Sequence, residues 1–117
     1  MSWWVSLKCP YCGQTLPVEK HSEGGTYVVG GSSEAELNVT YNYSQHYYTA
    51  LNGDDGLRWL DGKVAKDVVG DLQTAVASLG MERSEDYWEA TPGNAGYALS
   101  ILHRWALEHP DGVFEVS

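Results

Sequence analysis

The chain has 117 residues, of which 16 are acidic and 7 are basic, and its formal net charge is −9. This length fits one domain of ordinary size. The negative charge repels phosphate backbones and anionic lipid, so it argues against direct nucleic-acid binding. It suits solubility alone, a cationic partner, or mimicry of the charge of a nucleic acid. There are 5 Trp and 8 Tyr beside 1 Phe, which indicates that several aromatic side chains stay half exposed.

The sequence carries no recognisable targeting or membrane segment. The first residues, Met1 to Ser6, lack the basic and apolar regions of a signal peptide. No stretch approaches the roughly 18 apolar residues that a membrane span needs. A cytoplasmic protein without membrane contact is therefore expected, and in that compartment two cysteines do not make a disulfide framework.

Residues 1–43 are predicted to form mainly β-hairpins. Trp3–Lys8 alternates in the period-2 pattern of a half-buried strand, and Thr15–Lys20 can return as its hairpin partner. Thr26–Val29, between two Gly pairs, predicts a further short strand. Ala35–Tyr43 is the clearest strand, because an apolar and aromatic face alternates with a wholly polar one.

Residues 44–109 are predicted to be mainly helical. Gln45–Leu51 indicates a short helix, and an amphipathic stripe over Val64–Leu79 predicts a longer one. Thr91 as N-cap and Pro92 at the first helical position predict the start of the last helix. The apolar stripe of that helix is Ala95, Ala98, Leu99, Leu102, Trp105 and Ala106.

The last segment, residues 113–116, has the composition of a strand and is expected to rejoin the sheet. The whole chain is then a single α+β domain. It is expected to hold an antiparallel sheet of about four to five strands, with two main helices packed on one face. The opposite face of the sheet would meet water or a partner.

The first candidate site is the turn Cys9-Pro10-Tyr11-Cys12-Gly13. It resembles one half of a zinc ribbon, in which a tight turn directs two thiolates at one point. Zinc would need two further ligands, for which the chain offers His21, His46, His103 and His109. The alternatives are a zinc site at Cys9 and Cys12, or an unfilled turn with two spare thiols. A glutaredoxin-like redox role is disfavoured, because no helix can start well at Gly13.

The second candidate site is the polar face of the clearest strand. Its side chains are Asn38, Thr40 and Asn42, and Tyr47 and Tyr48 follow them. Amides both donate and accept hydrogen bonds, so they suit a polar ligand or an unpaired backbone edge. The two tyrosines would add a stacking wall. The alternative is a strand face that is only solvated.

Several strings of the sequence carry a resemblance to a group of proteins. They are GGTYVVGG, AELNVTYNYS, DYWEATPGNA and HPDGV. They resemble small uncharacterised proteins encoded by bacteriophages and prophages. The resemblance implies an accessory protein that acts in the host cytoplasm, and it names no chemistry.

Three functions stay open at this point. The favoured one is a non-enzymatic binding protein that blocks a host protein or sequesters a small ligand, and so counters host defence. The second is a small enzyme acting at Asn42, His46, Tyr47 and the Trp88–Asn94 loop, although these residues form no clear arrangement of nucleophile, base and orienter. The third is a structural protein that assembles with itself, and the sequence does not fix the oligomeric state.

Overall fold

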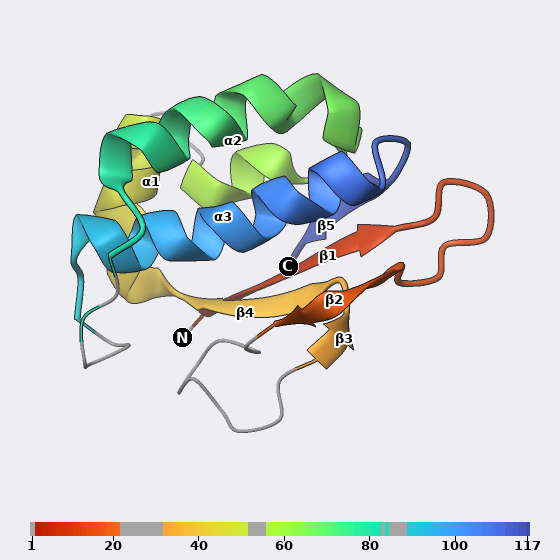
Figure 1. Cartoon of the computed structure of the whole chain (residues 1–117), viewed down its shortest axis with the longest axis horizontal. Coiled ribbons are helices and arrows are strands. Elements are labelled where there is room, and N and C mark those ends of the chain that lie inside the picture. The colour runs from red at the N-terminus through yellow and green to blue at the C-terminus, as the bar shows by residue number, and fades with distance from the viewer. Residues whose placement is uncertain (1, 22–31, 52–55, 83, 85–88) are drawn as a thin grey trace.

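The computed structural model describes residues 2–21, 32–51, 56–82, 84 and 89–117, and of residues 2, 19–21, 32 and 33 it describes the backbone alone. The predicted strand Thr26–Val29 lies outside the described residues. In chain order the elements are β1 (Ser2–Lys8), β2 (Pro17–His21), β3 (Ser32–Glu34), β4 (Glu36–Thr40), the 3-10 helix η1 (Tyr41–Tyr43), α1 (Ser44–Ala50), the 3-10 helix η2 (Gly56–Leu60), α2 (Ala65–Leu79), α3 (Pro92–Glu108) and β5 (Val113–Val116). Helices and strands occupy separate layers, which confirms the predicted α+β class (Figure 1).

The main sheet is smaller than the sequence predicts. It has three antiparallel strands in the order β4-β1-β5, and β2 and β3 pair separately. The reason is a change of partner at Ala35, the residue between β3 and β4. Its N–H donates to the carbonyl of Leu16 at 2.9 Å, whereas its own carbonyl accepts from the N–H of Leu7 at 3.0 Å. The expected sheet of four to five strands is therefore wrong in size.

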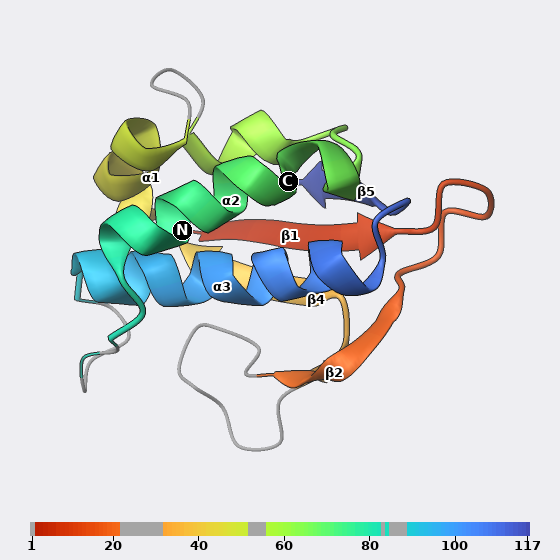
Figure 2. The same cartoon turned by 45° about the horizontal axis from the view of Figure 1, so that its top comes forward.

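One face of the main sheet packs beneath α1, α2 and α3, and no described helix covers the other face (Figures 1 and 2). Alternate side chains of the three strands are buried on the helical side: Trp3, Val5, Leu7, Leu37, Val39, Phe114 and Val116. None of the described helices has both the length and the apolar run needed to cross a membrane. On the second sheet face Trp4, Glu36 and Glu115 are exposed, whereas Ser6 between the two glutamates is only 9% exposed.

The long helices follow the predicted stripes. All six stripe residues of α3 are buried, and Val68, Leu72 and Ala75 are buried from α2. Thr91 caps α3 as predicted, since its Oγ1 accepts from the N–H of Asn94 at 3.0 Å.

The end of α2 touches the start of α3 through backbone. Gly80 ends α2 with a φ of 81°, a conformation that favours glycine. A Cβ added at Gly96 would overlap the carbonyl oxygen of Gly80. The two helices approach this closely because position 96 has no side chain.

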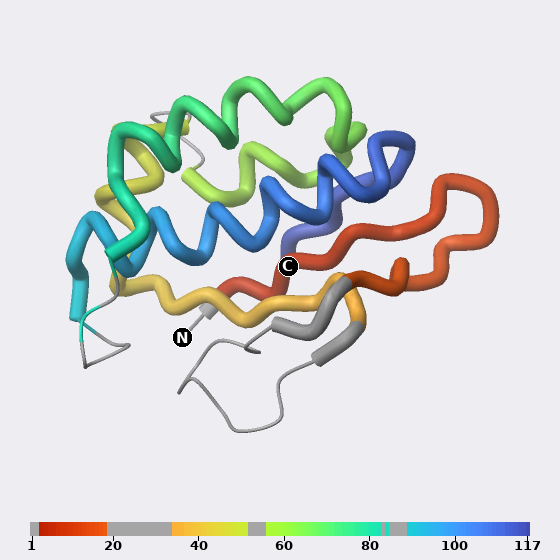
Figure 3. The backbone as a smooth tube through the Cα atoms, in the orientation of Figure 1, coloured from red at the N-terminus to blue at the C-terminus, as the bar shows by residue number. Residues whose placement is uncertain are grey.

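The outer edge of β5 is closed by the segment that follows η2. Phe114 exchanges hydrogen bonds with this segment, donating to the carbonyl of Lys63 at 2.9 Å and accepting from the N–H of Gly62 at 2.8 Å. Asp61 Oδ1 accepts from the N–H of Val116 at 3.0 Å. On the inner side, β5 runs antiparallel beside the second half of β1, residues 5–8, and the trace of Figure 3 shows the two strands side by side. An edge closed in this way cannot pair with a strand of another molecule.

Candidate functional site

The predicted polar face is interrupted at Thr40. This residue is 1% exposed, and its Oγ1 accepts from the N–H of Asn42 at 3.2 Å. The cap starts η1, so Tyr41–Tyr43 form a 3-10 turn instead of the end of a strand. Asn38 stays on β4, and Asn42 no longer shares a strand face with it. The expectation of one continuous face of three polar side chains is wrong for this reason.

The two tyrosines of the expected stacking wall are separated. Tyr47 is 0% exposed, its ring packs against Trp3 and Tyr43, and its hydroxyl donates to the carbonyl of Ala95 at 3.1 Å. Tyr48 is exposed and its ring lies over Gly56. Tyr47 therefore belongs to the core, and only Tyr48 is at the surface.

Replacing Tyr47 with phenylalanine is expected to lower the free energy of unfolding by about 0.5–1.5 kcal/mol, because the buried hydrogen bond from its hydroxyl to the carbonyl of Ala95 is lost. Urea unfolding followed by circular dichroism measures this difference. Tyr48→Phe is the matched control and should change stability by less than about 0.5 kcal/mol. Equal losses in both variants would contradict the core role of the Tyr47 hydroxyl.

Asn94, which the sequence placed at the end of a candidate enzyme loop, has a structural role that the sequence did not reveal. It is 2% exposed, its Oδ1 accepts from the N–H of Ser84 at 2.8 Å, and its Nδ2 donates to the carbonyl of Glu89 at 2.9 Å. His46 makes a further hydrogen bond at the same end of the molecule, with its Nε2 2.9 Å from the carbonyl oxygen of Ala90. These contacts hold the connection between α2 and α3. Trp88, the other end of the loop considered for an enzyme, lies outside the described residues.

The open face of the main sheet has Trp4 at its centre. Trp4 is 51% exposed, and the strand register places Asn38 directly opposite it on β4. On the other side Trp4 exchanges two backbone hydrogen bonds of 2.9 Å with Ser117. The amide Nδ2 of Asn38 donates to the carbonyl of Trp3 at 3.3 Å, which fixes this side chain across the strands. The sequence signal was a Trp among the polar positions of β1.

Two carboxylates flank the next row of the same face. Ser6 is paired with Glu36 on one side and with Glu115 on the other. Strands lie about 4.8 Å apart, so the two glutamates stand roughly 10 Å apart across Ser6. Both are exposed, and Glu115 is 3.7 Å from the Lys8 ammonium. We call Trp4, Asn38, Ser6, Glu36 and Glu115 the Trp4 face.

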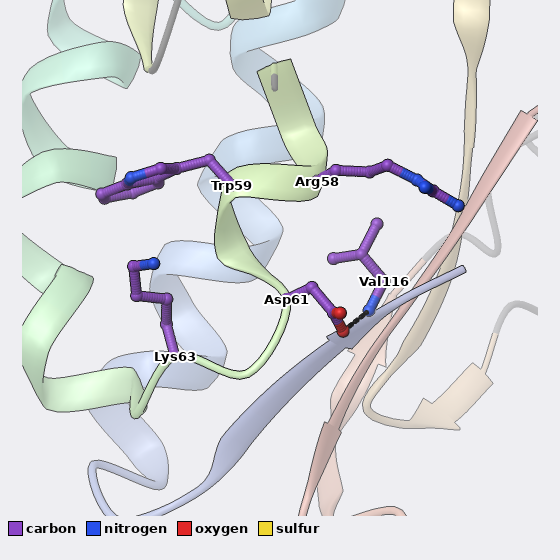
Figure 4. A pocket seen from close by; sticks show the side chains of 5 residues that line it. All are labelled: Arg58, Trp59, Asp61, Lys63 and Val116. Carbon is purple, nitrogen blue, oxygen red and sulfur yellow. Dashed lines mark hydrogen bonds between the residues drawn. The ribbon is translucent and has the colours of Figure 1, made fainter. Parts of the chain in front are cut away.

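A hollow of about 360 Å³ lies beside η2 and the end of β5, and Figure 4 shows its lining side chains. Arg58 and Trp59 point away from each other (Figure 4). The Lys63 ammonium lies 5.0 Å from the centre of the Trp59 ring, and the Asp61 carboxylate is bound to the N–H of Val116. The charged groups do not converge on one point of this hollow. We therefore assign its residues to the segment that closes the edge of β5.

The cysteine turn joins β1 to β2. Cys9 is partly buried, Cys12 is exposed, and both are free thiols. The N–H of Gly13 donates to the carbonyl of Cys9 at 3.0 Å, and the N–H of Cys9 donates to Gln14 at 2.9 Å. A hydrogen bond from the Cys12 thiol, followed by the N–H groups of Cys12, Tyr11 and Gly13, lowers the pKa of Cys9.

The described residues do not assemble a complete zinc site. Nowhere among them do three His, Cys, Asp or Glu side chains surround one metal position. His109 Nε2 contacts the carbonyl oxygen of Pro17 at 2.5 Å, and His46 is bound to Ala90. Cys9 and Cys12 are thus a pair of thiol donors without a third protein ligand in the described part of the chain.

Comparison with protein-family models, with curated proteins and with solved structures finds no significant match. Function is therefore inferred from the surfaces of the molecule. Large hydrophobic side chains are exposed at Trp4, Tyr11, Tyr41, Tyr48, Met81 and Leu107. Of this set, Trp4 projects from a strand, and the pairing of that strand on both sides holds its backbone rigid.

Proposed function

We propose that the protein is a non-enzymatic binding module whose Trp4 face docks a basic segment of a partner protein. The observation that carries this proposal is the half-exposed Trp4 beside the row formed by Glu36, Ser6 and Glu115. A cation over the face of a Trp ring gains about 0.5–2 kcal/mol, depending on how dry the contact is. The Glu36 and Glu115 carboxylates supply the opposite charge next to the ring, and the Lys8 ammonium, 3.7 Å from Glu115, balances part of it.

Rigidity supports the same proposal. The neighbouring β1 side chains Trp3 and Val5 are buried in the core, so the backbone that carries Trp4 is fixed before a partner arrives. Binding then loses little conformational entropy on this side of the interface. Trp residues held in this way recur as energetic centres of protein interfaces.

Charge favours a basic protein as the partner. The net charge of −9 attracts a cationic surface from a distance and repels nucleic acid. If the chain has the bacteriophage origin that its sequence strings imply, the basic partner is a host protein that binding would block. A role in countering host defence follows from that origin.

The test uses a short peptide of alternating arginine and glycine as the probe. Backbone and indole NMR signals of the protein are followed while the peptide is added, and calorimetry gives the dissociation constant. Trp4→Ala is expected to weaken binding by about tenfold, which corresponds to a cation–π contact of about 1.4 kcal/mol. Glu36→Gln combined with Glu115→Gln should also weaken it, and added salt should reduce the difference from the wild type.

Asp67→Asn combined with Asp71→Asn is the matched charge control, because it also removes two negative charges and both residues are exposed on α2 in the helical layer. It should bind the peptide like the wild type. A peptide of alternating glutamate and glycine should leave the spectra unchanged. Full affinity in Trp4→Ala, or shifts confined to the helices, would refute the Trp4 face as the docking surface.

A further inference from the structure

The cysteine turn presents two sulfur donors at one end of the molecule. It forms the tip that projects beyond both layers along the longest axis (Figures 1 and 2). One short turn carries both cysteines, and two backbone hydrogen bonds of Cys9 close it: its N–H donates to the carbonyl of Gln14 at 2.9 Å, and its carbonyl accepts from the N–H of Gly13 at 3.0 Å. Two cysteines separated by two residues in a tight turn are the spacing by which proteins direct two thiolates at one metal ion.

The number of donors decides which metal suits the turn. A structural zinc ion needs four ligands, and the described residues offer two at this place. Soft thiolate donors select soft ions, among which copper(I) is satisfied by two sulfur ligands. Magnesium and calcium ions prefer oxygen ligands, so they are not expected to bind the two thiolates of the turn.

We propose that Cys9 and Cys12 bind one copper(I) ion through both thiolates, one ion for each chain. Binding forms two metal–sulfur bonds and releases the two thiol protons, and no electron is transferred. This inference is independent of the Trp4 face and of any partner protein.

The surroundings of the turn suit an exchangeable ion. Cys12 is exposed and Tyr11 is 93% exposed, so a small copper carrier can reach the sulfur atoms. Cys9 borders a hollow of about 300 Å³, which it shares with Leu16 and His109. Gly13, with a φ of 75°, and the two hydrogen bonds between Cys9 and residues 13 and 14 hold the turn closed without a metal. The thiols are therefore expected to be dispensable for folding.

The experiment is an anaerobic titration of the reduced protein with copper(I), in competition with a chromogenic copper(I) chelator. Native mass spectrometry is expected to show one copper per monomer. Cys9→Ser and Cys12→Ser should each lower copper(I) affinity by at least about a hundredfold, because each removes one of the two ligands, and loss of a residue that only supports a ligand already costs about 10–100-fold. Thermal unfolding of both variants should stay within a few degrees of the wild type, which separates loss of a ligand from loss of the fold.

His109→Ala is the matched control, because His109 lines the same hollow and is the imidazole that a larger ligand set would recruit. Its copper(I) affinity should equal that of the wild type. A loss of affinity in this variant would overturn the two-thiolate site. So would zinc bound in preference to copper(I), a metal shared between two chains, or no metal bound at all.

Discussion

Replacing Leu102 with alanine is expected to lower the free energy of unfolding by about 2–5 kcal/mol. Leu102 is 0% exposed, and it lies in the α3 stripe beside Leu99 and Trp105. The substitution removes buried methyl groups and leaves a cavity that the packed helices and sheet fill only in part. Small domains have total stabilities of about 5–15 kcal/mol, so the loss would be a large share of the whole. Guanidinium unfolding followed by Trp fluorescence measures it.

Leu107→Ala is the control on the same helix. Leu107 is 59% exposed, so the same chemical change should alter stability by less than about 0.5 kcal/mol. The comparison removes the effect of helix propensity, because both variants exchange leucine for alanine within α3. A loss below about 0.5 kcal/mol for Leu102→Ala would mean that the buried face of α3 is assigned wrongly.

Glycine-to-alanine substitutions are expected to have opposite signs in the two long helices. Propensity alone favours alanine by about 0.5–1 kcal/mol in a helix interior. At Gly70, on α2, an added Cβ meets nothing within 4 Å, so Gly70→Ala should raise the free energy of unfolding by about this amount. At Gly96 the added Cβ meets the backbone carbonyl of Gly80, which has no flexible side chain to move away. Gly96→Ala should therefore lower stability by about 1–3 kcal/mol in spite of propensity.

Calorimetry of thermal unfolding, run on both variants and on the wild type, tests these two predictions. The melting temperature should rise for Gly70→Ala and fall for Gly96→Ala. A rise at both positions would show that the α2–α3 connection can shift to admit a methyl group, and the close approach at Gly80 would then not be a constraint on the fold.

The helices were predictable because their signals are local. The Val68, Leu72 and Ala75 spacing and the Thr91 cap depend only on neighbouring residues, and the structure confirms both. The end of β4 was not predictable in the same way. Apolar and polar residues continue to alternate through Tyr43, but the Thr40 side chain caps the next turn and the chain leaves the strand. Alternation alone cannot distinguish a strand that continues from a strand that ends in a capped turn.

The size of the sheet and the position of the exposed Trp depend on distant parts of the chain. Ala35 changes hydrogen-bond partner between Leu16 and Leu7, and no local pattern encodes that exchange. The pair Trp4 and Asn38 becomes visible only when β1 and β4 are placed in register. The sequence predicted Asn38 as a surface residue of interest, but it could not identify its neighbour across the strands.

The pairing of β1 with β5 also has a consequence for the order in which the protein can fold. The central strand of the sheet lies near the start of the chain and one of its two partners near the end, where Trp4 and Ser117 exchange hydrogen bonds. On a ribosome, β1 emerges long before β5, while α2 and α3 can already form local turns. The sheet closes late, because contacts between such distant residues carry the largest cost in loop entropy. Until the helices pack on it, the apolar side of β1 is exposed during synthesis, and such a surface is one that chaperones bind.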